Sequence, residues 1–330
     1  MTAKGQPVVI VGAARTPVGV KCGTLRQFSA EDLGAAAGTE AIRRSGLPAE
    51  RVSAVVGANV YQFTAPGTQD IYFPRNVGLR CGLRTEAPAL MVQRICGSGL
   101  QTVINAYQQI LLPPAVDDAD VVLCVGAETM SCAPRIVRSL RGAANFWEFA
   151  DAGAVEDSML ASLNHDLART SMMLTADEYG KRMEITRRAC DEFADLSHTR
   201  ARAAQKASWL NGGDLLRGMF AFEATDLTGR PVHLARDECV RKTSLDVLEK
   251  LPALTPNGLV SAGNASEISD GAAALVLASA EVVEQLGIDA RFEVLAYGVA
   301  GVDPKVMGRG PVPAIQQALA RARLTLRDVG

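Results

Sequence analysis

One cysteine of this 330-residue chain lies in a setting that suits nucleophilic chemistry. Cys96 follows the short segment 92–95 and is followed at once by Gly97, Ser98 and Gly99. This order predicts a sharp turn from a strand into a helix, where unpaired N–H groups and the helix dipole face the sulfur and favour its thiolate. Small residues after the cysteine let an acyl group approach backbone N–H groups able to hold an oxyanion. A buried structural cysteine beside a tight turn is the alternative interpretation.

The other potentially reactive side chains show no comparable pattern. The chain has seven cysteines, an odd number without any C-x-x-C pair, so the sequence predicts neither a disulfide framework nor a zinc site. We expect the other cysteines to be structural, namely Cys22, Cys81, Cys124, Cys132, Cys190 and Cys239. The histidines are expected on the surface or at helix flanks, namely His165, His198 and His233. No metal is expected.

Alternating strands and helices must position the turn at Cys96. Short apolar runs predict strands at residues 8–12, 54–60, 89–93, 121–125, 272–279 and 292–301. Ser29, with Asp32 three residues later, predicts a capped helix that ends at Gly46. Further helices are expected after Pro74 and over residues 96–112, 186–210, 280–286 and 312–323. Such alternation predicts an α/β fold with a partly parallel sheet covered by helices.

Composition divides the chain into three segments. Residues 127–257 contain many Arg, Met and Asp residues and few strand-like runs, whereas strand and helix patterns dominate residues 1–126 and 258–330. A short echo relates the outer segments, A-I-R-R-S-G-L at 41–47 and A-L-A-R-A-R-L at 318–324. We therefore expect two related halves separated by an insertion, with the second half incomplete.

Bulk composition excludes several classes of partner. The net charge of -2 provides no broad positive field for nucleic acid or an anionic membrane. No apolar run approaches the ~18 residues that span a bilayer, and the first six residues lack the order of a signal peptide. We expect a cytoplasmic protein that binds neither nucleic acid nor membrane.

Several ordered segments resemble the motifs of the thiolase family. The segment V-Q-R-I-C-G-S-G-L-Q around Cys96 resembles the family's active-site signature. Further matches are A-A-R-T-P at 13–17, V-G-A-E-T-M-S at 125–131, G-L-V-S-A-G-N-A-S-E-I-S-D-G at 258–271 and M-G-R-G-P-V-P-A at 307–314. The resemblance implies a thiolase-like fold over most of the chain, with two related βαβαβ-type halves whose mixed sheets are covered by helices and whose second half is incomplete.

The resemblance also implies a thioester reaction. Family members transfer an acyl group from a 3-ketoacyl-CoA to the cysteine that matches Cys96, release acetyl-CoA, and pass the acyl group to free CoA. The reverse reaction is a Claisen condensation, and fatty acid beta-oxidation is one setting for the forward one. A thiolate suits both directions, because its thioester is close in energy to that of CoA. The resemblance implies no cofactor beyond the CoA thioesters themselves, and it implies a homodimer or homotetramer.

The resemblance assigns four positions to CoA binding. Arg241 matches a contact near the adenine and phosphate end, and Ala262 and Ser266 match contacts along the pantetheine arm. Met172 belongs to segment 171–177, which resembles the loop that covers the substrate in many members. The insertion 127–257 is therefore expected to contact CoA. The nearby polar residues Asn264 and Asp270 are expected to fix turn geometry instead.

Some positions depart from the family pattern. Gln93 stands in place of Asn, and Ser171 and Met173 replace a histidine and a glycine in the substrate-covering loop. Glu267 and Ser269 replace Gly and Asn in the CoA-side turn. A carboxylate at Glu267 would alter acyl-chain or carrier preference, or would simply face solvent.

The largest departure is an absence. The family's N-E-A-F and G-H-P segments, and the segment with its second, basic cysteine, have no counterpart here. We therefore expect a C-terminally incomplete thiolase that is nearly inactive in full turnover, because each lost group typically contributes about 10²-fold or more. The alternative is a naturally short, non-catalytic protein that binds acyl-CoA or a partner chain through an open sheet edge. A decarboxylating ketoacyl synthase fits the G-N-A-S and G-P-V-P segments less well.

Overall fold

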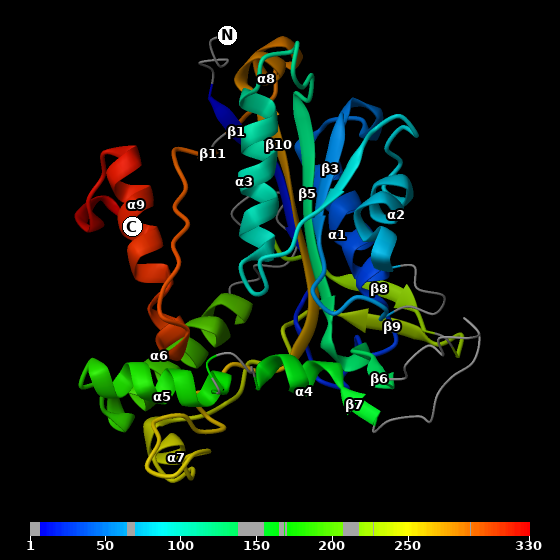
Figure 1. Cartoon of the computed structure of the whole chain (residues 1–330). Coiled ribbons are helices and arrows are strands. Elements are labelled where there is room, and N and C mark those ends of the chain that lie inside the picture. Colours follow the sequence, from blue (N-terminus) through cyan, green and yellow to red (C-terminus); the bar gives the residue numbers. More distant parts are fainter. Residues whose placement is uncertain are drawn as a thin grey trace, which may run out of the picture.

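A seven-stranded mixed sheet runs through the middle of the molecule (Figure 1). The computed structural model describes residues 7–64, 70–137, 155–164, 168, 170–206, 218–226, 228–290 and 292–330. The strand order is β11-β1-β10-β5-β3-β4, and β2 pairs with β10. These strands are β1 (Val8–Arg15), β2 (Gly19–Val20), β3 (Ala54–Ala58), β4 (Ala89–Met91), β5 (Val121–Thr129), β10 (Ser269–Ser279) and β11 (Phe292–Glu293).

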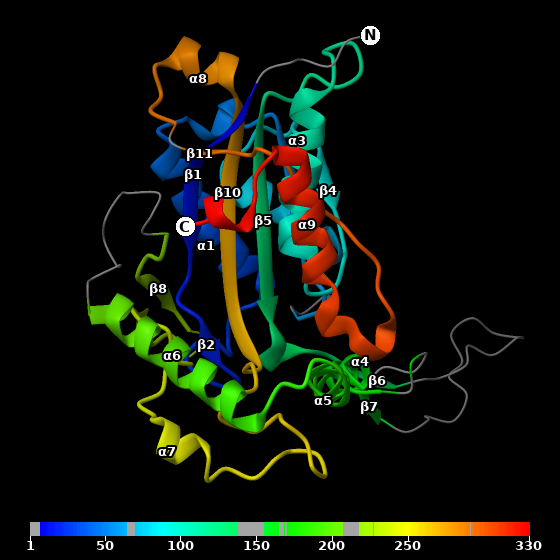
Figure 2. The same cartoon turned by 90° about the vertical axis from the view of Figure 1, so that its left-hand side faces the viewer.

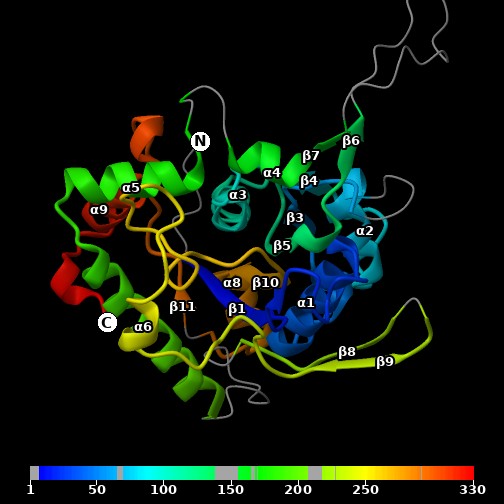
Figure 3. The ribbon, with the colours of Figure 1, turned by 90° about the horizontal axis from the view of Figure 1, so that it is seen from below.

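Helices cover both faces of this sheet, which gives the expected α/β architecture. Helices α1 (Ala30–Ser45) and α2 (Phe73–Arg80) lie on one face, where α1 contacts β1, β10 and β5. Helix α3 (Ser98–Leu111) lies on the other face, against β5, β3 and β10 (Figures 1 and 3). The remaining helices are α4 (Ser158–Leu163), α5 (Met172–Arg182), α6 (Arg187–Lys206), α7 (Leu245–Leu248), α8 (Ala280–Leu286) and α9 (Pro311–Ala322).

The insertion forms a layer at one end of the sheet, below it in Figure 1. It contains α4 to α7 and two small antiparallel ladders. These ladders are β6 (Arg135–Val137) with β7 (Val155–Asp157), and β8 (Phe222–Thr225) with β9 (Pro231–Leu234). The N-terminal end of α3, which follows the turn at Cys96, points toward α4 (Figures 1 and 3). The segment 207–210 of the predicted helix 186–210 lies outside the described residues. Among the described helices, none is long and apolar enough to span a membrane.

The cap predicted for the first helix is present. The hydroxyl of Ser29 accepts a hydrogen bond from the amide of Asp32 at 3.1 Å, and the Asp32 carboxylate accepts from the amide of Ser29 at 2.9 Å. Gly46 ends the helix with φ 73°, the left-handed conformation that glycine adopts without strain. The buried face of α1, which includes Leu33, Ala37 and Ala41, then packs into the core against the sheet.

Strand β10 lies at the centre of the sheet although it follows the insertion. It pairs antiparallel with β1 from Val8↔Ser279 to Arg15↔Ala273, and antiparallel with β5 from Asp270↔Thr129 to Ala278↔Val121. Strand β3 is parallel to both β5 and β4, so the sheet is mixed as expected. The predicted division into 1–126, 127–257 and 258–330 stays a prediction about domains, but one sheet contains strands from both outer segments.

The strand predicted at residues 292–301 is much shorter than expected. Only β11 pairs, with Val9 and Ile10 of β1, and residues 294–301 form no ladder in the described structure. Side chains hold this segment between α3 and α9: Gln108 donates to the Tyr297 hydroxyl at 2.8 Å, and Arg321 donates to its carbonyl at 2.6 Å (Figure 2). Leu295 of this segment is 58% exposed, so the apolar run neither forms a ladder nor becomes buried in the described structure.

The echo between the outer segments is also visible in the structure. Helix α1 ends at a left-handed residue and is followed by the short 3-10 helix η1 (Ala49–Arg51). Helix α9 likewise ends at left-handed Arg323 and is followed by η5 (Leu326–Asp328). A glycine approaches each helix so closely that a Cβ would lie 2.2 Å (Gly12) or 1.9 Å (Gly298) from a helix carbonyl oxygen. The two outer segments thus share a helix, cap and contact pattern.

The cap of α1 provides a test of this part of the fold. Replacing Ser29 with alanine leaves a helix N–H without its acceptor, so the free energy of unfolding should fall by about 1 kcal/mol. Urea denaturation followed by circular dichroism measures this change. Ser244→Ala is the matched control, because Ser244 caps α7 without a side-chain hydrogen bond. Equal losses in the two variants would contradict the role assigned to Ser29.

Candidate active site

The hydroxyl of Ser98 holds the turn that carries Cys96. This buried hydroxyl accepts a hydrogen bond from the amide of Arg94 at 2.7 Å and donates to the carbonyl of Ile95 at 2.6 Å. The amide of Gly97 also donates to the carbonyl of Arg94 at 3.0 Å. Ile95 adopts φ 48°, a conformation that costs energy for a β-branched residue. The turn therefore has one fixed shape between β4 and α3.

Two facing glycines let the start of α3 lie close to β5. A Cβ on Gly126 would lie 3.7 Å from the Cα of Gly99. Upstream of the turn, the amide of Val92 donates to the carbonyl of Gly57 at 3.0 Å, which continues the contact between β4 and β3. The ends of three parallel strands thus fix the position of Cys96, as expected for a nucleophile between a strand and a helix.

Cys96 is exposed, which excludes the alternative of a buried structural thiol. It lies at the N-terminus of α3, where the helix dipole favours negative charge. Cys81 and Cys124 are buried by contrast, and burial raises the pKa of both thiols, that of Cys124 to about 12. Cys22 is the other exposed cysteine of the described residues, but it lies in a turn away from any long helix start.

The expected oxyanion donors are only partly available at this turn. The amides of Gly97 and Ser98 donate to the carbonyls of Arg94 and Ile95, both at 3.0 Å, because the chain tightens into a helix there. These two amides are therefore occupied. The amides of Gly99 and Leu100 follow, and they belong to the first turn of α3, where N–H groups lack an acceptor within the helix. The amide of Gln101 donates to the carbonyl of Gly97 at 3.0 Å.

Glu128, within the segment V-G-A-E, organises the chain after β3. Its carboxylate accepts hydrogen bonds from the side-chain amide of Asn59 at 2.8 Å, the amide of Val60 at 2.9 Å and the amide of Tyr61 at 3.1 Å. Burial raises the pKa of Glu128 to about 7, and the nearby Asp70 carboxylate adds to the increase. The motif marks this residue in the sequence, but its contacts could be found only from the fold.

The structure brings together Arg241 and Ala262 among the predicted CoA contacts. The guanidinium of Arg241 donates to the carbonyl of Ala262 at 3.3 Å and forms an ion pair with Glu267. Ser266 is exposed on the same turn. Among the described residues, Glu267 thus has Arg241 as its ionic partner, and its side chain is 33% exposed. No hydrogen bond or ion pair found among the described residues connects this group to Cys96.

Buried carboxylates fasten the loop that precedes β10, and sequence reasoning missed two of them. Asp177 of α5 accepts from the amides of Leu259 at 2.7 Å and Val260 at 3.2 Å. Asp191 of α6 accepts from the side-chain amide of Asn264 at 2.9 Å. Asn264 also accepts from the amide of Ser261 at 2.8 Å, which confirms its predicted structural role. The only signal for Asp177 was its place in the segment S-M-M-L-T-A-D.

Asp270 and the substrate-loop residues also have structural partners. The buried Asp270 accepts from the amide of Ser131 at 2.9 Å and from its hydroxyl at 2.6 Å, as predicted for a residue that fixes geometry. Ser171, which departs from the family's histidine, caps α5 by accepting from the amide of Leu174 at 3.2 Å. Met172 is the first residue of that helix and is half-buried.

The described histidines lie outside the Cys96 turn. His198 of α6 accepts from the amide of Arg241 at 3.3 Å, and burial together with nearby arginines lowers its pKa. On the exposed β8–β9 ladder, Nδ1 of His233 lies 3.1 Å from Oε1 of Glu223. His165 lies outside the described residues. Within the described part of the chain, no group of side chains is arranged to hold a metal ion.

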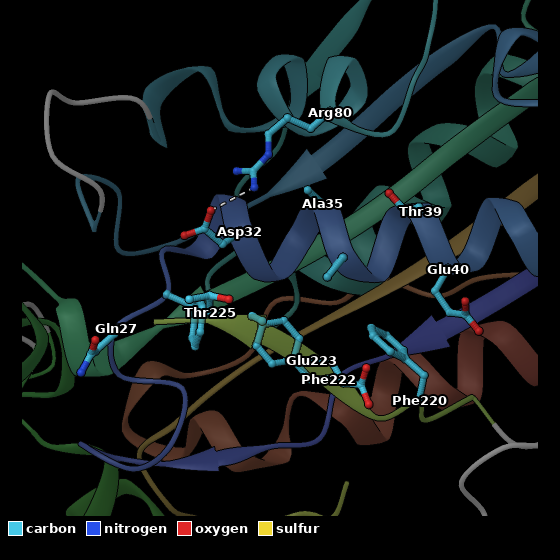
Figure 4. A pocket seen from close by; sticks show the side chains of 13 residues that line it. Gln27, Asp32, Ala35, Thr39, Glu40, Arg80, Phe220, Phe222, Glu223 and Thr225 are labelled. Carbon is cyan, nitrogen blue, oxygen red and sulfur yellow. Dashed lines mark ion pairs between the residues drawn. The ribbon is translucent and has the colours of Figure 1, made fainter. Parts of the chain in front are cut away.

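The larger of two described cavities lies away from Cys96. It has a volume of about 630 Å³ and opens between α1 and the β8–β9 ladder (Figure 4). Aromatic rings of Phe220 and Phe222 line it together with Glu40, Asp32 and the ion-paired Arg80. Asp32 and Glu40 have arginine partners, and Glu223 lies beside His233, so the carboxylates of this cavity are engaged away from the nucleophile.

Comparison with known proteins identifies the class of this fold and site. The family model "Thiolase, N-terminal domain" matches residues 8–281, which include β10. The chain belongs to the thiolase family, a family of acyltransferases.

Individual relatives extend the likeness over nearly the whole chain. Human mitochondrial 3-ketoacyl-CoA thiolase is 36% identical over 323 residues, which are 98% of this chain and 78% of the relative. Acetyl-CoA acetyltransferase of Cupriavidus necator is 38% identical over 324 residues, with the same coverage. The crystal structure of the human enzyme in complex with CoA matches with a TM-score of 0.87 and 36% identity, over 99% of this chain and 78% of that one.

The raised pKa of Glu128 predicts a pH dependence of stability. The folded state holds this proton more tightly than the unfolded chain, whose glutamate has a pKa near 4.5. The contribution is fully present below about pH 4.5 and is lost as the pH rises through about 7, a change of up to about 3 kcal/mol. Urea titrations at several pH values should show this slope in the native chain and a flatter one in Glu128→Gln. Glu223→Gln, with a 74% exposed side chain, should keep the native slope.

Thiol exposure predicts a pattern of alkylation. Iodoacetamide at pH 8 should modify Cys96 and Cys22 in the folded protein, because both are exposed. Cys81 and Cys124 should react only after denaturation, since they are buried and their pKa values are raised. Peptide mass spectrometry over a time course measures each site. Alkylation of Cys124 as fast as that of Cys96 would contradict the packing of α3 on β5.

Proposed function

We propose that this protein transfers acyl groups between coenzyme A thioesters through an acyl-Cys96 intermediate. The observation that carries the proposal is an exposed cysteine on a fixed turn at the N-terminus of α3, in a chain of the thiolase family. The relatives named as 3-ketoacyl-CoA thiolase and acetyl-CoA acetyltransferase support this reaction class.

The reaction would proceed in two steps. The Cys96 thiolate attacks the 3-keto carbonyl of a 3-ketoacyl-CoA, and the bond between C2 and C3 breaks. The electron pair of that bond leaves on the acetyl-CoA fragment, which takes up a proton, and the acyl group stays on sulfur as a thioester. The thiol of free CoA then attacks this thioester, loses its proton, and releases a shortened acyl-CoA and the Cys96 thiolate.

The structure supports defined roles for residues of this chain. Ser98 would fix the sulfur by holding the turn, and the α3 dipole would stabilise negative charge on it. Arg241 would bind the phosphate end of CoA, Ala262 and Ser266 would lie along its pantetheine arm, and Met172 would cover the substrate. The complex of the human relative with CoA supports binding of this carrier.

Two further expectations remain part of the proposal. A homodimer or homotetramer is expected from the family, and the exposed side chain of Leu90 on the edge strand β4 is compatible with a partner at that edge. A cytoplasmic location also stays a prediction, and some relatives are named as mitochondrial.

Acyl transfer to Cys96 provides the direct test. Incubation of the 330-residue chain with acetoacetyl-CoA or acetyl-CoA should add one acetyl group, detected by intact-protein mass spectrometry and located on the Cys96 peptide. Cys96→Ser should lose this acylation by at least about 100-fold, because an alcohol at neutral pH is a far weaker nucleophile than a thiolate. Cys22→Ser is the matched control, since it removes the other exposed thiol of the described residues and should acylate normally.

Two other outcomes would be informative. Acylation that is lost equally in both variants, or that maps to another cysteine, would reject Cys96 as the nucleophile. Binding of CoA with no acylation under any condition would support the alternative of a non-catalytic acyl-CoA-binding protein.

A further inference from the structure

The cation predicted to meet the phosphate end of CoA already has an anionic partner within the chain. Arg241 forms an ion pair with Glu267, and its guanidinium also donates to the carbonyl of Ala262 at 3.3 Å. The side chains of Arg241 and Glu267 are 47% and 33% exposed. A ligand that approaches from solvent can therefore reach both side chains.

Basic side chains lie close to this ion pair. Arg202 of α6 donates to the backbone carbonyl of Arg241 at 2.7 Å, which brings a second guanidinium to the same place. His198 accepts from the amide of Arg241 at 3.3 Å, and Lys242 follows directly in the sequence. Asp195 also lies near His198 on the same helix. The acids that precede Arg241 have other partners, since Asp237 pairs with Arg15 and Glu238 accepts from the amide of Val20. Among the described residues, Glu267 is thus the carboxylate in direct contact with the Arg241 guanidinium, a group that suits a phosphate.

The backbone that carries Glu267 is held on both sides. Before it, Asn264 is fixed by the carboxylate of Asp191 at 2.9 Å and by the carbonyl of Leu259 at 3.0 Å. After it, the buried Asp270 is fixed by Ser131. The short turn between these anchors presents Glu267 beside Arg241, so this contact follows from the local fold.

We infer that Glu267 sets the carrier specificity of this site: by occupying the guanidinium of Arg241, it weakens binding of the phosphate-bearing end of CoA and leaves binding of the pantetheine arm unchanged. The inference rests on the proposed function, because it places CoA at this surface. A phosphate and a carboxylate compete for the same guanidinium donors, and they repel each other when both are close. The chain should therefore distinguish CoA from pantetheine thioesters less than a site with a free arginine would.

Binding of the free carriers tests this inference without any acyl transfer. Isothermal titration calorimetry, under reducing conditions, would compare CoA with pantetheine, which lacks the nucleotide and all phosphates. In Glu267→Gln, the Kd for CoA should fall by about two- to fivefold, the range expected for release of a partly exposed ion pair. The Kd for pantetheine should not change, and the gain for CoA should shrink at high salt.

Two further variants isolate the cause. In an Arg241→Gln background, Glu267→Gln should produce no gain in CoA affinity, because the competed cation is absent. Glu249→Gln is the control, since Glu249 pairs with Arg188 instead of Arg241 and should leave both affinities unchanged.

Several results would overturn the inference. They are an unchanged CoA affinity in Glu267→Gln, an equal gain for pantetheine, a gain that persists without Arg241, and no CoA binding by either the native chain or the variant. Failure of acylation at Cys96 with the expected binding pattern would reject the proposed reaction but not this role of Glu267.

Discussion

The position of the candidate nucleophile depends on one buried hydroxyl group. Ser98 closes the five-residue segment 94–98, because its oxygen accepts from Arg94 and donates to Ile95. A turn with a β-branched residue at positive φ would otherwise relax, since that conformation is unfavourable. The close contact between Gly99 of α3 and Gly126 of β5 then fixes this turn relative to the central sheet. An exposed sulfur can thus be held in place by groups that are themselves buried.

Carboxylates join the insertion to the strand β10 and the loop before it. Each carboxylate accepts hydrogen bonds from backbone or side-chain donors that would otherwise be buried without partners. Asp177 and Asp191 each accept at least one hydrogen bond from the loop that leads into β10, and each of Asp177, Asp191 and Asp270 accepts two or more in all. Their burial is tolerable because each is satisfied by several donors. The same loop carries Ala262, Ser266 and Glu267. The surface proposed for CoA therefore depends on carboxylates that are not themselves assigned to CoA binding.

Much of the framework could be predicted from the sequence, and the failures have physical causes. The cap at Ser29, the strand that precedes Cys96 and the helix 280–286 depend on local chemistry and are found as predicted. The strand predicted at 292–301 is wrong over most of its length, because an apolar run forms a ladder only beside a partner strand, and residues 294–301 have none among the described residues. The pair of Arg241 with Glu267 joins residues distant in sequence, and no local pattern predicts such a contact. The amides of Gly97 and Ser98 donate to backbone carbonyls within the closed turn. The sequence does not specify how tightly this turn closes, so these hydrogen bonds could not be predicted from it.

The central place of β10 has a consequence for how the chain acquires its structure. Both neighbours of β1 in the sheet, β10 and β11, are translated after the whole insertion. A nascent chain that has emerged only as far as β5 therefore exposes the apolar sides of β1 and β5 with no strand between them. Such long-range pairing is slow to form, and unpaired edges favour aggregation. Closure of the central sheet must therefore wait until the insertion and β10 have been synthesised.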